Sequence, residues 1–238
     1  MSTLAPDCTA LSIQPDALLH LLQLASPSLP VGGYSYSQGL EAAMEKGLVT
    51  DAATARTWLV NMLHQVVARF EAPLMWRLLN AWSAGDNEAV VGWSEMLLAG
   101  RDTAEMRAET VQMGYSLTRL VIELAVADAS LQAMLEALPE VPFACAYAFA
   151  AVALNVPPQA ALRAMLFGWA ENQVLVCIKS VPLGQVAGQR LLLSLRPDLE
   201  AAALAAQSCA DEDLCNWAPG LSLLSMQHEV QYSRLYRS

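Results

Sequence analysis

The feature that most restricts how this chain can fold is the spacing of its apolar residues. The clearest run lies between Asp51 and Phe70, where the apolar positions are Trp58, Leu59, Met62, Leu63, Val66, Val67 and Phe70. Intervals of three and four residues place these side chains on one face of an α-helix. No segment combines period-two alternation with β-branched residues, so we expect no β-sheet. The sequence therefore predicts an all-α fold.

Capping residues, prolines and glycines divide the apolar pattern into separate helices. Asp51 and Asp86 stand where a helix N-cap is expected, Pro73 suits a first turn, and Gly85 suits a helix end. We predict helices over about 16–25, 38–46, 51–70, 73–85, 86–100, 102–127, 143–154, 162–178, 189–195 and 197–209.

The resulting interpretation is a single compact domain of about nine or ten helices. No internal repeat or low-complexity linker divides the chain. We expect a flexible leader over residues 1–14, the helical domain over 15–222 and a C-terminal tail over 223–238. Residues 211–222 resemble a loop.

Charge and cysteine content limit the partners and the compartment. The formal net charge is −10, which opposes binding to nucleic acid or to an anionic membrane. The longest nearly apolar run, Val141–Leu154, is too short to span a bilayer. Five cysteines without a small-scaffold framework favour a reducing compartment, so we expect a cytoplasmic protein. An apolar content of 55% exceeds what one core requires and favours an oligomer.

The motifs of common enzymes are absent from the sequence. There is no phosphate-binding glycine loop, no dinucleotide fingerprint and no nucleophile elbow. Only three histidines are present, and Cys209 and Cys215 lack metal-hook spacing, so we expect no tightly bound metal or cofactor. His228 is a weak metal candidate, because a capping or salt-bridging role with Glu229 suits the pair better. A binding or scaffold protein is thus favoured over an enzyme.

The stretch Leu29–Glu41, LPVGGYSYSQGLE, has the composition of a specified loop between two helices. Glycines allow φ > 0 or a close backbone approach, and tyrosines give rigid contact area with a polar tip. Ser35 or Ser37 can N-cap the next helix. A packed interhelical turn is the simpler interpretation, and a binding surface is the alternative. The candidate residues in this loop are Pro30, Gly32, Gly33, Tyr34, Ser35, Tyr36, Gln38 and Glu41.

The roles of two clusters of charged or polar residues on the predicted helices stay open. Arg101, Glu105 and Glu109 belong to a cluster for which we favour a solvated helix face, with a docking face as the alternative. The polar triplet Glu171–Gln173 interrupts an apolar helix, and we expect it to face outward.

The segment Val181–Leu192 contains GQVAG, whose two glycines lie four apart. This spacing suits close helix packing or an interface. The last residues, HEVQYSRLYRS, place Tyr232, Leu235 and Tyr236 on one helical face between Arg234 and Arg237. That pattern suits helix-in-groove recognition, or equally packing on the tail's own subunit. The candidate residues in these segments are Lys179, Pro182, Gly184, Gln185, Gln189, Arg190, His228, Glu229, Tyr232, Arg234, Leu235, Tyr236 and Arg237.

The segments 29–41, 101–114, 181–192 and 228–238 together resemble the urease accessory protein F (UreF) family, in the same order along the chain. The resemblance implies an all-α, dimeric, cytoplasmic scaffold for nickel insertion into urease, rather than an enzyme. It implies binding to the accessory protein UreD (also called UreH), through it to apo-urease, and to the GTPase UreG, whose nucleotide use it modulates. Nickel and GTP then belong to the partners.

The same resemblance implies that three regions bind partners: the loop, the segment Val181–Arg190 and the tail. It implies that the tail docks on UreD/UreH. Arg190, Arg234 and Arg237 are the preferred charged contacts. Two alternatives stay open. One is a small-molecule enzyme with a pocket inside the helical bundle, for which Glu171 and His64 are candidates. The other is an independent nickel carrier.

Overall fold

The computed structural model describes residues 13–181 and 183–238, and over these it contains α-helices and short 3₁₀ turns but no strand. The prediction of an all-α, single-domain fold is confirmed. The twelve α-helices of the described residues are α1 (Pro15–Leu24), α2 (Leu40–Glu45), α3 (Ala52–Gln65), α4 (Glu71–Ala84), α5 (Asn87–Ala99), α6 (Ala104–Glu123), α7 (Ala129–Glu136), α8 (Phe143–Ala153), α9 (Pro158–Ser180), α10 (Gln185–Ser194), α11 (Arg196–Ser208) and α12 (Pro219–Glu229).

Local sequence signals fix several helix ends as predicted. The Asp51 side chain accepts a hydrogen bond from the Thr54 N–H at 2.8 Å. The Thr54 side chain in turn accepts a hydrogen bond from the Asp51 N–H, which completes a capping box. Asp86 caps α5 through the Ala89 N–H. Gly85 ends α4 at a φ of 67°, in the left-handed region that glycine enters without strain.

Other boundaries differ from the prediction. The helix expected over 51–70 ends at Gln65 and gives way to a 3₁₀ turn, Val67–Arg69, where two β-branched valines weaken helix propensity. The long helix ends at Glu123, because Ala125 takes a positive φ of 49°. Helix α7 was missed, and α12 crosses the predicted boundary at residue 222. These two helices explain why the described residues contain twelve α-helices, whereas nine or ten were expected.

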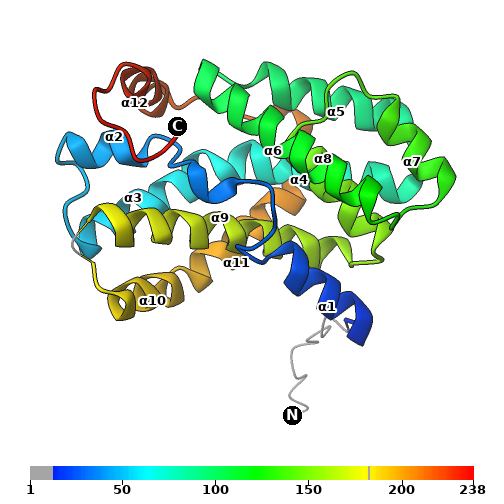
Figure 1. Ribbon diagram of the computed structural model, residues 1–238, viewed down its shortest axis with the longest axis horizontal. Coiled ribbons are helices and arrows are strands. Elements are labelled where there is room, and N and C mark those ends of the chain that lie inside the picture. Colours follow the sequence, from blue (N-terminus) through cyan, green and yellow to red (C-terminus); the bar gives the residue numbers. More distant parts are fainter. Residues whose placement is uncertain (1–12, 182) are drawn as a thin grey trace, which may run out of the picture.

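The core lies where α8 packs between α4 and α6 (Figure 1). Helix α8 is apolar all round, and Trp82 of α4 meets Phe149 edge to face at a ring distance of 5.1 Å. At Gly114 of α6, a β-carbon would collide with the backbone of Val141 and Pro142. The absence of a side chain there therefore permits the close approach of α6 to the start of α8.

The sequence was right about two buried cysteines and about the apolar run. Cys145 and Cys177 are both fully buried with free thiols, and burial raises the pKa of Cys145 to about 11. The apolar run Val141–Leu154 contains the core helix α8. Over the residues described here, no helix combines the length and apolarity needed to cross a membrane. The predicted leader lies almost wholly outside the described residues.

Candidate partner-binding site at the loop–tail junction

The loop Leu29–Glu41, which we call the signature loop, and the end of the chain lie against each other, although they are about 200 residues apart in sequence (Figure 1). The Ser37 N–H donates to the main-chain oxygen of Ser238 at 2.8 Å, and the Arg237 N–H donates to the Ser35 carbonyl oxygen at 2.8 Å. The Ser37 hydroxyl also donates to the Ser238 oxygen. We call residues 35–41, residues 228–238 and the α6 side chains that face them the loop–tail junction.

Glu41 is the centre of this junction. Its side chain is only 9% exposed, and one of its oxygens accepts from the Leu235 N–H at 2.7 Å. The other oxygen accepts from the Tyr236 N–H at 3.1 Å and from His228 Nε2 at 2.9 Å. Three donors on the tail thus satisfy one buried carboxylate on α2, as a buried charge requires.

His228 links two carboxylates from different helices. Its side chain is fully buried, with Nε2 at 2.9 Å from Glu41 and Nδ1 at 2.9 Å from Glu105 of α6. Each ring nitrogen of His228 thus lies within hydrogen-bonding distance of a carboxylate oxygen. The second Glu105 oxygen accepts from Arg234 at 3.0 Å. The tail therefore meets two acidic side chains through His228 and Arg234.

Glu109, one turn after Glu105 on α6, joins the loop to the last residue of the chain. It accepts from Gln38 Nε2 at 2.7 Å and from the Ser238 hydroxyl at 2.9 Å. Burial raises the pKa of this carboxyl to about 7, against the lowering effect of its two hydrogen bonds. Glu109 is therefore the acidic group of the junction that changes charge near neutral pH.

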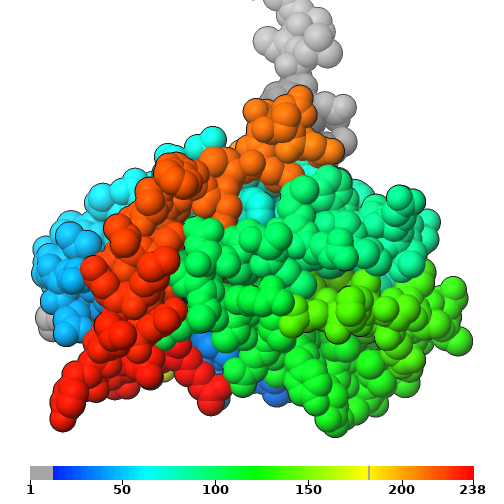
Figure 2. Space-filling view, turned by 90° about the horizontal axis from the view of Figure 1, so that it is seen from above, coloured from blue at the N-terminus to red at the C-terminus, as the bar shows by residue number. Residues whose placement is uncertain are grey.

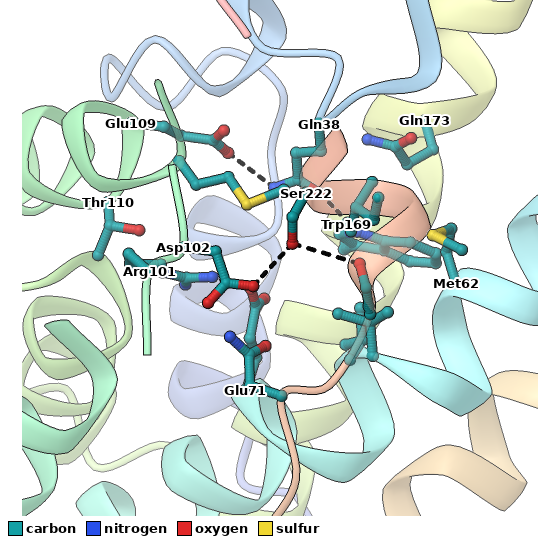
Figure 3. Close-up of a pocket in the computed structure, with 16 residues that line it drawn as sticks. Gln38, Met62, Glu71, Arg101, Asp102, Glu109, Thr110, Trp169, Gln173 and Ser222 are labelled. Atoms are coloured by element: carbon teal, nitrogen blue, oxygen red, sulfur yellow. Dashed lines mark hydrogen bonds and ion pairs between the residues drawn. The ribbon is translucent and has the colours of Figure 1, made fainter. Parts of the chain in front are cut away.

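Gln38 is held in an unusual backbone conformation by its side chain. Its φ is 55°, uncommon for a residue other than glycine, and Trp169 Nε1 of α9 donates to its Oε1 at 2.8 Å. Figure 3 shows Gln38 between Glu109 and Trp169, at the wall of a small polar pocket that also includes Glu71 and Arg101. The side-chain bonds to Glu109 and Trp169 thus stabilise the turn into α2.

Tyr36 and Lys179 complete the contacts between loop, tail and α9. The Tyr36 hydroxyl donates to Gln112 of α6 at 2.9 Å, and burial raises the pKa of the phenol. Asn172 of α9 donates to the Tyr36 carbonyl oxygen at 2.9 Å. The Lys179 ammonium lies 5.8 Å from the centre of the Tyr236 ring, within cation–π range.

The predicted site residues thus fall into two groups. Residues 35–41 and the tail form the junction, and Lys179 lies beside it. His228, Glu41 and Tyr236 are buried there, whereas Tyr34, Glu229, Arg234 and Arg237 are exposed. Gly32 takes the positive φ that its position suggested, 77°. The candidates on α10 and its N-cap, Gly184, Gln185, Gln189 and Arg190, lie apart from the tail in Figure 1. Pro182 lies outside the described residues.

The helical interpretation of the tail was wrong. Helix α12 ends at Glu229, and residues 230–238 form turns and extended backbone. Tyr232 and Leu235 therefore do not share a face with Tyr236: they are 106% and 73% exposed, whereas Tyr236 is 7% exposed. The carboxylate of Glu41 captures the backbone N–H groups of residues 235 and 236, which a continuing helix would use internally.

The expected solvated face on α6 was also wrong for its glutamates. Glu109 is 7% exposed, the Glu105 side chain is 10% exposed, and both hold the tail. Arg101 pairs with Glu71 of α4 instead of with Glu105. Within the triplet 171–173, Gln173 is 2% exposed, so the triplet does not simply face outward.

The GQVAG glycines behave differently from each other. A β-carbon at Gly188 would collide with the Ile178 side chain of α9, whereas a β-carbon at Gly184 would meet nothing within 4 Å. Gly188 therefore serves close packing within the subunit, as the simpler interpretation held.

Residues of the junction that sequence reasoning missed are Gln112, Trp169 and Asn172, together with the tail-binding roles of Glu105 and Glu109. One signal existed, because polar residues on an otherwise apolar helix face are expected to find buried partners. It could not say which partners, since these come from segments up to about 136 residues away.

The described residues contain no group of three His, Cys, Asp or Glu side chains that could hold a metal. His228 uses both ring nitrogens for carboxylates, which removes it as a candidate ligand in this arrangement. His64 lies 3.2 Å from Asp198 and is not among the residues that line the groove beside Glu171. The two candidates for an enzymatic pocket are therefore not brought together.

Comparison with known proteins gives one consistent match. The family model described as UreF matches residues 49–196. A urease accessory protein UreF of Janthinobacterium sp. (strain Marseille) is 66% identical over 226 residues, which cover 95% of this chain and 100% of the relative. The UreF proteins of Nitrosospira multiformis and Azoarcus sp. (strain BH72) are 59% and 51% identical, each over 93% of this chain and over 98% and 95% of their own lengths.

Proposed function

The chain belongs to the UreF family of urease accessory proteins, and we propose that it acts in the cytoplasm as a scaffold for nickel insertion into urease. In this role it binds UreD/UreH through the tail, reaches apo-urease through that partner, and holds the GTPase UreG. It thereby couples GTP hydrolysis to assembly of the metallocentre, while nickel and GTP stay on the partners. A homodimer would order two GTPase subunits symmetrically.

The observation that carries this proposal is a run of exposed large apolar side chains between residues 217 and 235, just before α12, on α12 and on the tail, which we call the apolar stripe. The large apolar side chains of this stripe are Trp217 at 81% exposure, Leu223 at 57%, Met226 at 48%, Val230 at 84%, Tyr232 at 106% and Leu235 at 73%. So many exposed large apolar side chains within one short segment favour a binding partner for that segment. Figure 2 shows α12 and the tail, in orange and red, lying across the outer surface of the molecule.

The loop–tail junction explains why this stripe is suited to binding. His228 and Tyr236 are buried on either side of the exposed Tyr232 and Leu235, so the segment between them is tied at both ends. A tied segment loses less conformational entropy when a partner binds than a free terminus would. The exposed Arg234 and Arg237 add guanidinium groups of the kind found at interaction hot spots.

A scaffold also needs more than one surface. Helix α10 presents Val186, which is 66% exposed, and Leu193, which is 56% exposed, beside Gln189 and Arg190. This surface is separate from the tail, which allows a second partner or a second copy to bind without displacing UreD/UreH. Tyr34 of the loop is also exposed, at 57%.

The test is a double substitution of the exposed tail residues, Tyr232→Ser with Leu235→Ser. Truncation at His228 would be less informative, because it removes the buried partner of Glu41 and Glu105 and so disturbs the fold. We expect the double variant to fold normally and to lose capture of UreD/UreH by at least tenfold in a pull-down. Urease from cells carrying it should contain correspondingly less nickel.

The matched control is Tyr115→Ser with Leu204→Ser. These residues are of the same types and are also exposed, at 61% and 56%, but they lie on α6 and α11. The control should retain capture of UreD/UreH and normal urease nickel. Full capture by the tail variant would show that the stripe is not the UreD/UreH surface. Loss of capture by both double variants would show that the effect is not specific to the tail.

A further inference from the structure

The three buried carboxylates of the loop–tail junction do not have the same kind of partner. Glu41 and Glu105 each lie 2.9 Å from a ring nitrogen of His228. Glu109 is as buried as Glu41, at 7% exposure, but its hydrogen bonds come from uncharged groups, the Gln38 amide at 2.7 Å and a serine hydroxyl of the tail at 2.9 Å. A buried carboxylate without a cation is more costly in its ionised form than in its neutral form.

In the part of the chain that the structure describes, no basic side chain forms an ion pair with Glu109. The ionisable side chains that act on its charge or share the walls of the two pockets it lines are Tyr36, Glu71, Arg101, Asp102, Tyr147 and Glu171. Arg101 is the positive one of these, and it is paired with Glu71 of α4. On the tail, Arg237 contacts Gln112 instead. Burial therefore outweighs the hydrogen bonds to this carboxyl and raises its pKa to about 7.

The contacts of Glu109 close the end of the tail onto the signature loop. The Ser238 hydroxyl bonds the Glu109 carboxylate, and the main-chain oxygen of Ser238 accepts from the Ser37 N–H. One residue earlier, the Arg237 N–H donates to the Ser35 carbonyl oxygen. A serine hydroxyl can accept as well as donate, so its contact with the carboxyl is also compatible with a protonated carboxyl.

We call residues 35–38, residues 237–238 and Glu109 the latch. Its turn is strained, because Gln38 has a φ of 55°, and the bond from Gln38 Nε2 to Glu109 is one of two side-chain bonds that hold it there. A strained backbone persists only while its surroundings hold it. Glu41 binds the preceding tail residues independently, so the latch can open while the rest of the tail stays attached.

We propose that a proton on Glu109 operates the latch, which is closed when this carboxyl is neutral and opens when it is ionised. Opening moves Gln38 and Ser238 away from the carboxyl and lets water reach the charge. The pKa of the carboxyl is then about 7 in the closed latch and returns toward its ordinary value of 4.5 in the open one. Because the closed state binds the proton more tightly, closure is favoured at low pH and weakens as the pH rises through 7. The latch is a property of the chain alone and does not rest on the proposed scaffold role.

The test measures the protection of two backbone N–H groups against hydrogen exchange, by NMR of the full chain at pH 6 and pH 8. The reporters are the N–H groups of Ser37 and Arg237, whose hydrogen bonds belong to the closed latch. A carboxyl with these two pKa values changes the closing equilibrium about tenfold between pH 6 and pH 8. We therefore expect both protection factors, corrected for the intrinsic exchange rate, to fall about tenfold from pH 6 to pH 8.

Two variants separate Glu109 from the other groups that titrate. In Glu109→Gln, which is neutral at every pH, the protection factors should be equal at the two pH values and match those of the wild type at pH 6. Glu123→Gln is the matched control, because Glu123 lies on the same helix but its side chain is 63% exposed, and it should keep the tenfold fall. An equal fall in the wild type and in Glu109→Gln would overturn the proposal, since another group, such as His228, would then be responsible.

A third reporter shows whether the latch opens by itself. The Phe149 N–H belongs to the core helix α8, where exchange requires unfolding of the domain. We expect Ser37 and Arg237 to be less protected than Phe149 and to keep their protection in dilute urea, which promotes exchange through unfolding. Equal protection and equal urea dependence of the three groups would overturn the proposal, because the tail end would then be released only with the whole fold.

A further measurement needs no variant. The carboxyl carbon of Glu109, followed by ¹³C NMR in the wild type, should titrate with a midpoint near pH 7. A midpoint near 4.5 would show that the closed latch does not bind a proton more tightly than the open one, and would end the proposal.

Discussion

The apolar core and the loop–tail junction are buried to the same degree by opposite chemistry. In the core, Trp82 and Phe149 are each 1% exposed and meet through their aromatic rings. In the junction, His228 is 0% exposed and Ser238 is 1% exposed, and they meet carboxylates. Apolar contacts are not directional, so a core tolerates exchange of similar shapes. Hydrogen bonds to carboxylates are directional, so the junction depends on each of its donor and acceptor side chains.

This difference predicts how each region fails. A core residue that is changed in volume leaves a cavity or a clash whose cost depends on local relaxation. A junction residue that is removed leaves a buried charge, and the cost is the desolvation of that charge. The four predictions below compare the two regions, in order of decreasing effect on the free energy of unfolding.

The largest effect is expected from Gly114→Ala in the core. The new β-carbon would collide with the carbonyl oxygen of Val141 and would lie 2.8 Å from the Pro142 carbonyl carbon. These atoms are backbone and cannot rotate away, so we expect a loss of roughly 4 kcal/mol, above the usual range for overpacking. Urea unfolding measures it. Gly92→Ala on α5, whose β-carbon meets nothing within 4 Å, is the control and should be neutral or slightly stabilising.

The next effect tests the junction through His228→Ala. The substitution leaves Glu41 and Glu105 buried with fewer donors, and we expect a loss of roughly 3 kcal/mol in urea unfolding. His64→Ala is the matched control, because His64 also faces a carboxylate but is 32% exposed, so its loss should be below about 1 kcal/mol. Equal losses in the two variants would contradict the view that burial makes the junction costly to break.

The third prediction concerns the pH dependence of stability through Glu109. Its folded pKa is raised to about 7, so the folded state holds this proton more strongly than the unfolded chain does. That contribution to stability is complete below about pH 4.5 and is lost as the pH rises through 7. Between pH 5.5 and 8 the wild type should lose roughly 2 kcal/mol relative to Glu109→Gln, measured by urea unfolding at each pH. Parallel pH profiles for the two proteins would show that Glu109 does not titrate in this range.

The smallest effect is expected from Tyr236→Phe. The ring lies buried beside Lys179, whereas the hydroxyl makes no hydrogen bond of good geometry to the described residues, although Ser180 is near. Removing it should change the free energy of unfolding by less than about 1 kcal/mol. A thermal melt in parallel with wild type is sufficient. A large loss of stability would show that the tyrosine hydroxyl, and not the carboxylates alone, stabilises the junction.

Prediction from sequence worked where the information is local. Asp51, Asp86 and Gly85 act on their own helix ends, and each was identified correctly. Most of its failures came where a residue several helices away decides the outcome, and one local signal, at α7, was overlooked. The tail was interpreted as a helix because its side chains have helical spacing, but Glu41 captures its backbone. Helix α7 was missed although Asp128 is an N-cap of the same kind as Asp86.

The sequence by itself determined an all-α chain, most of its helix positions, its apolar core helix α8 and its membership of the UreF family. The helices follow from periodicity and capping, which act over a few residues at a time, and the family membership follows from the order of motifs along the chain. Only the tertiary structure decided that Glu41, Glu105 and Glu109 hold the tail, and that Tyr232 and Leu235 face solvent. Those outcomes depend on which distant groups meet in a buried space. Folding lowers the local dielectric there, which strengthens a hydrogen bond or ion pair and raises the cost of leaving a polar group unpaired.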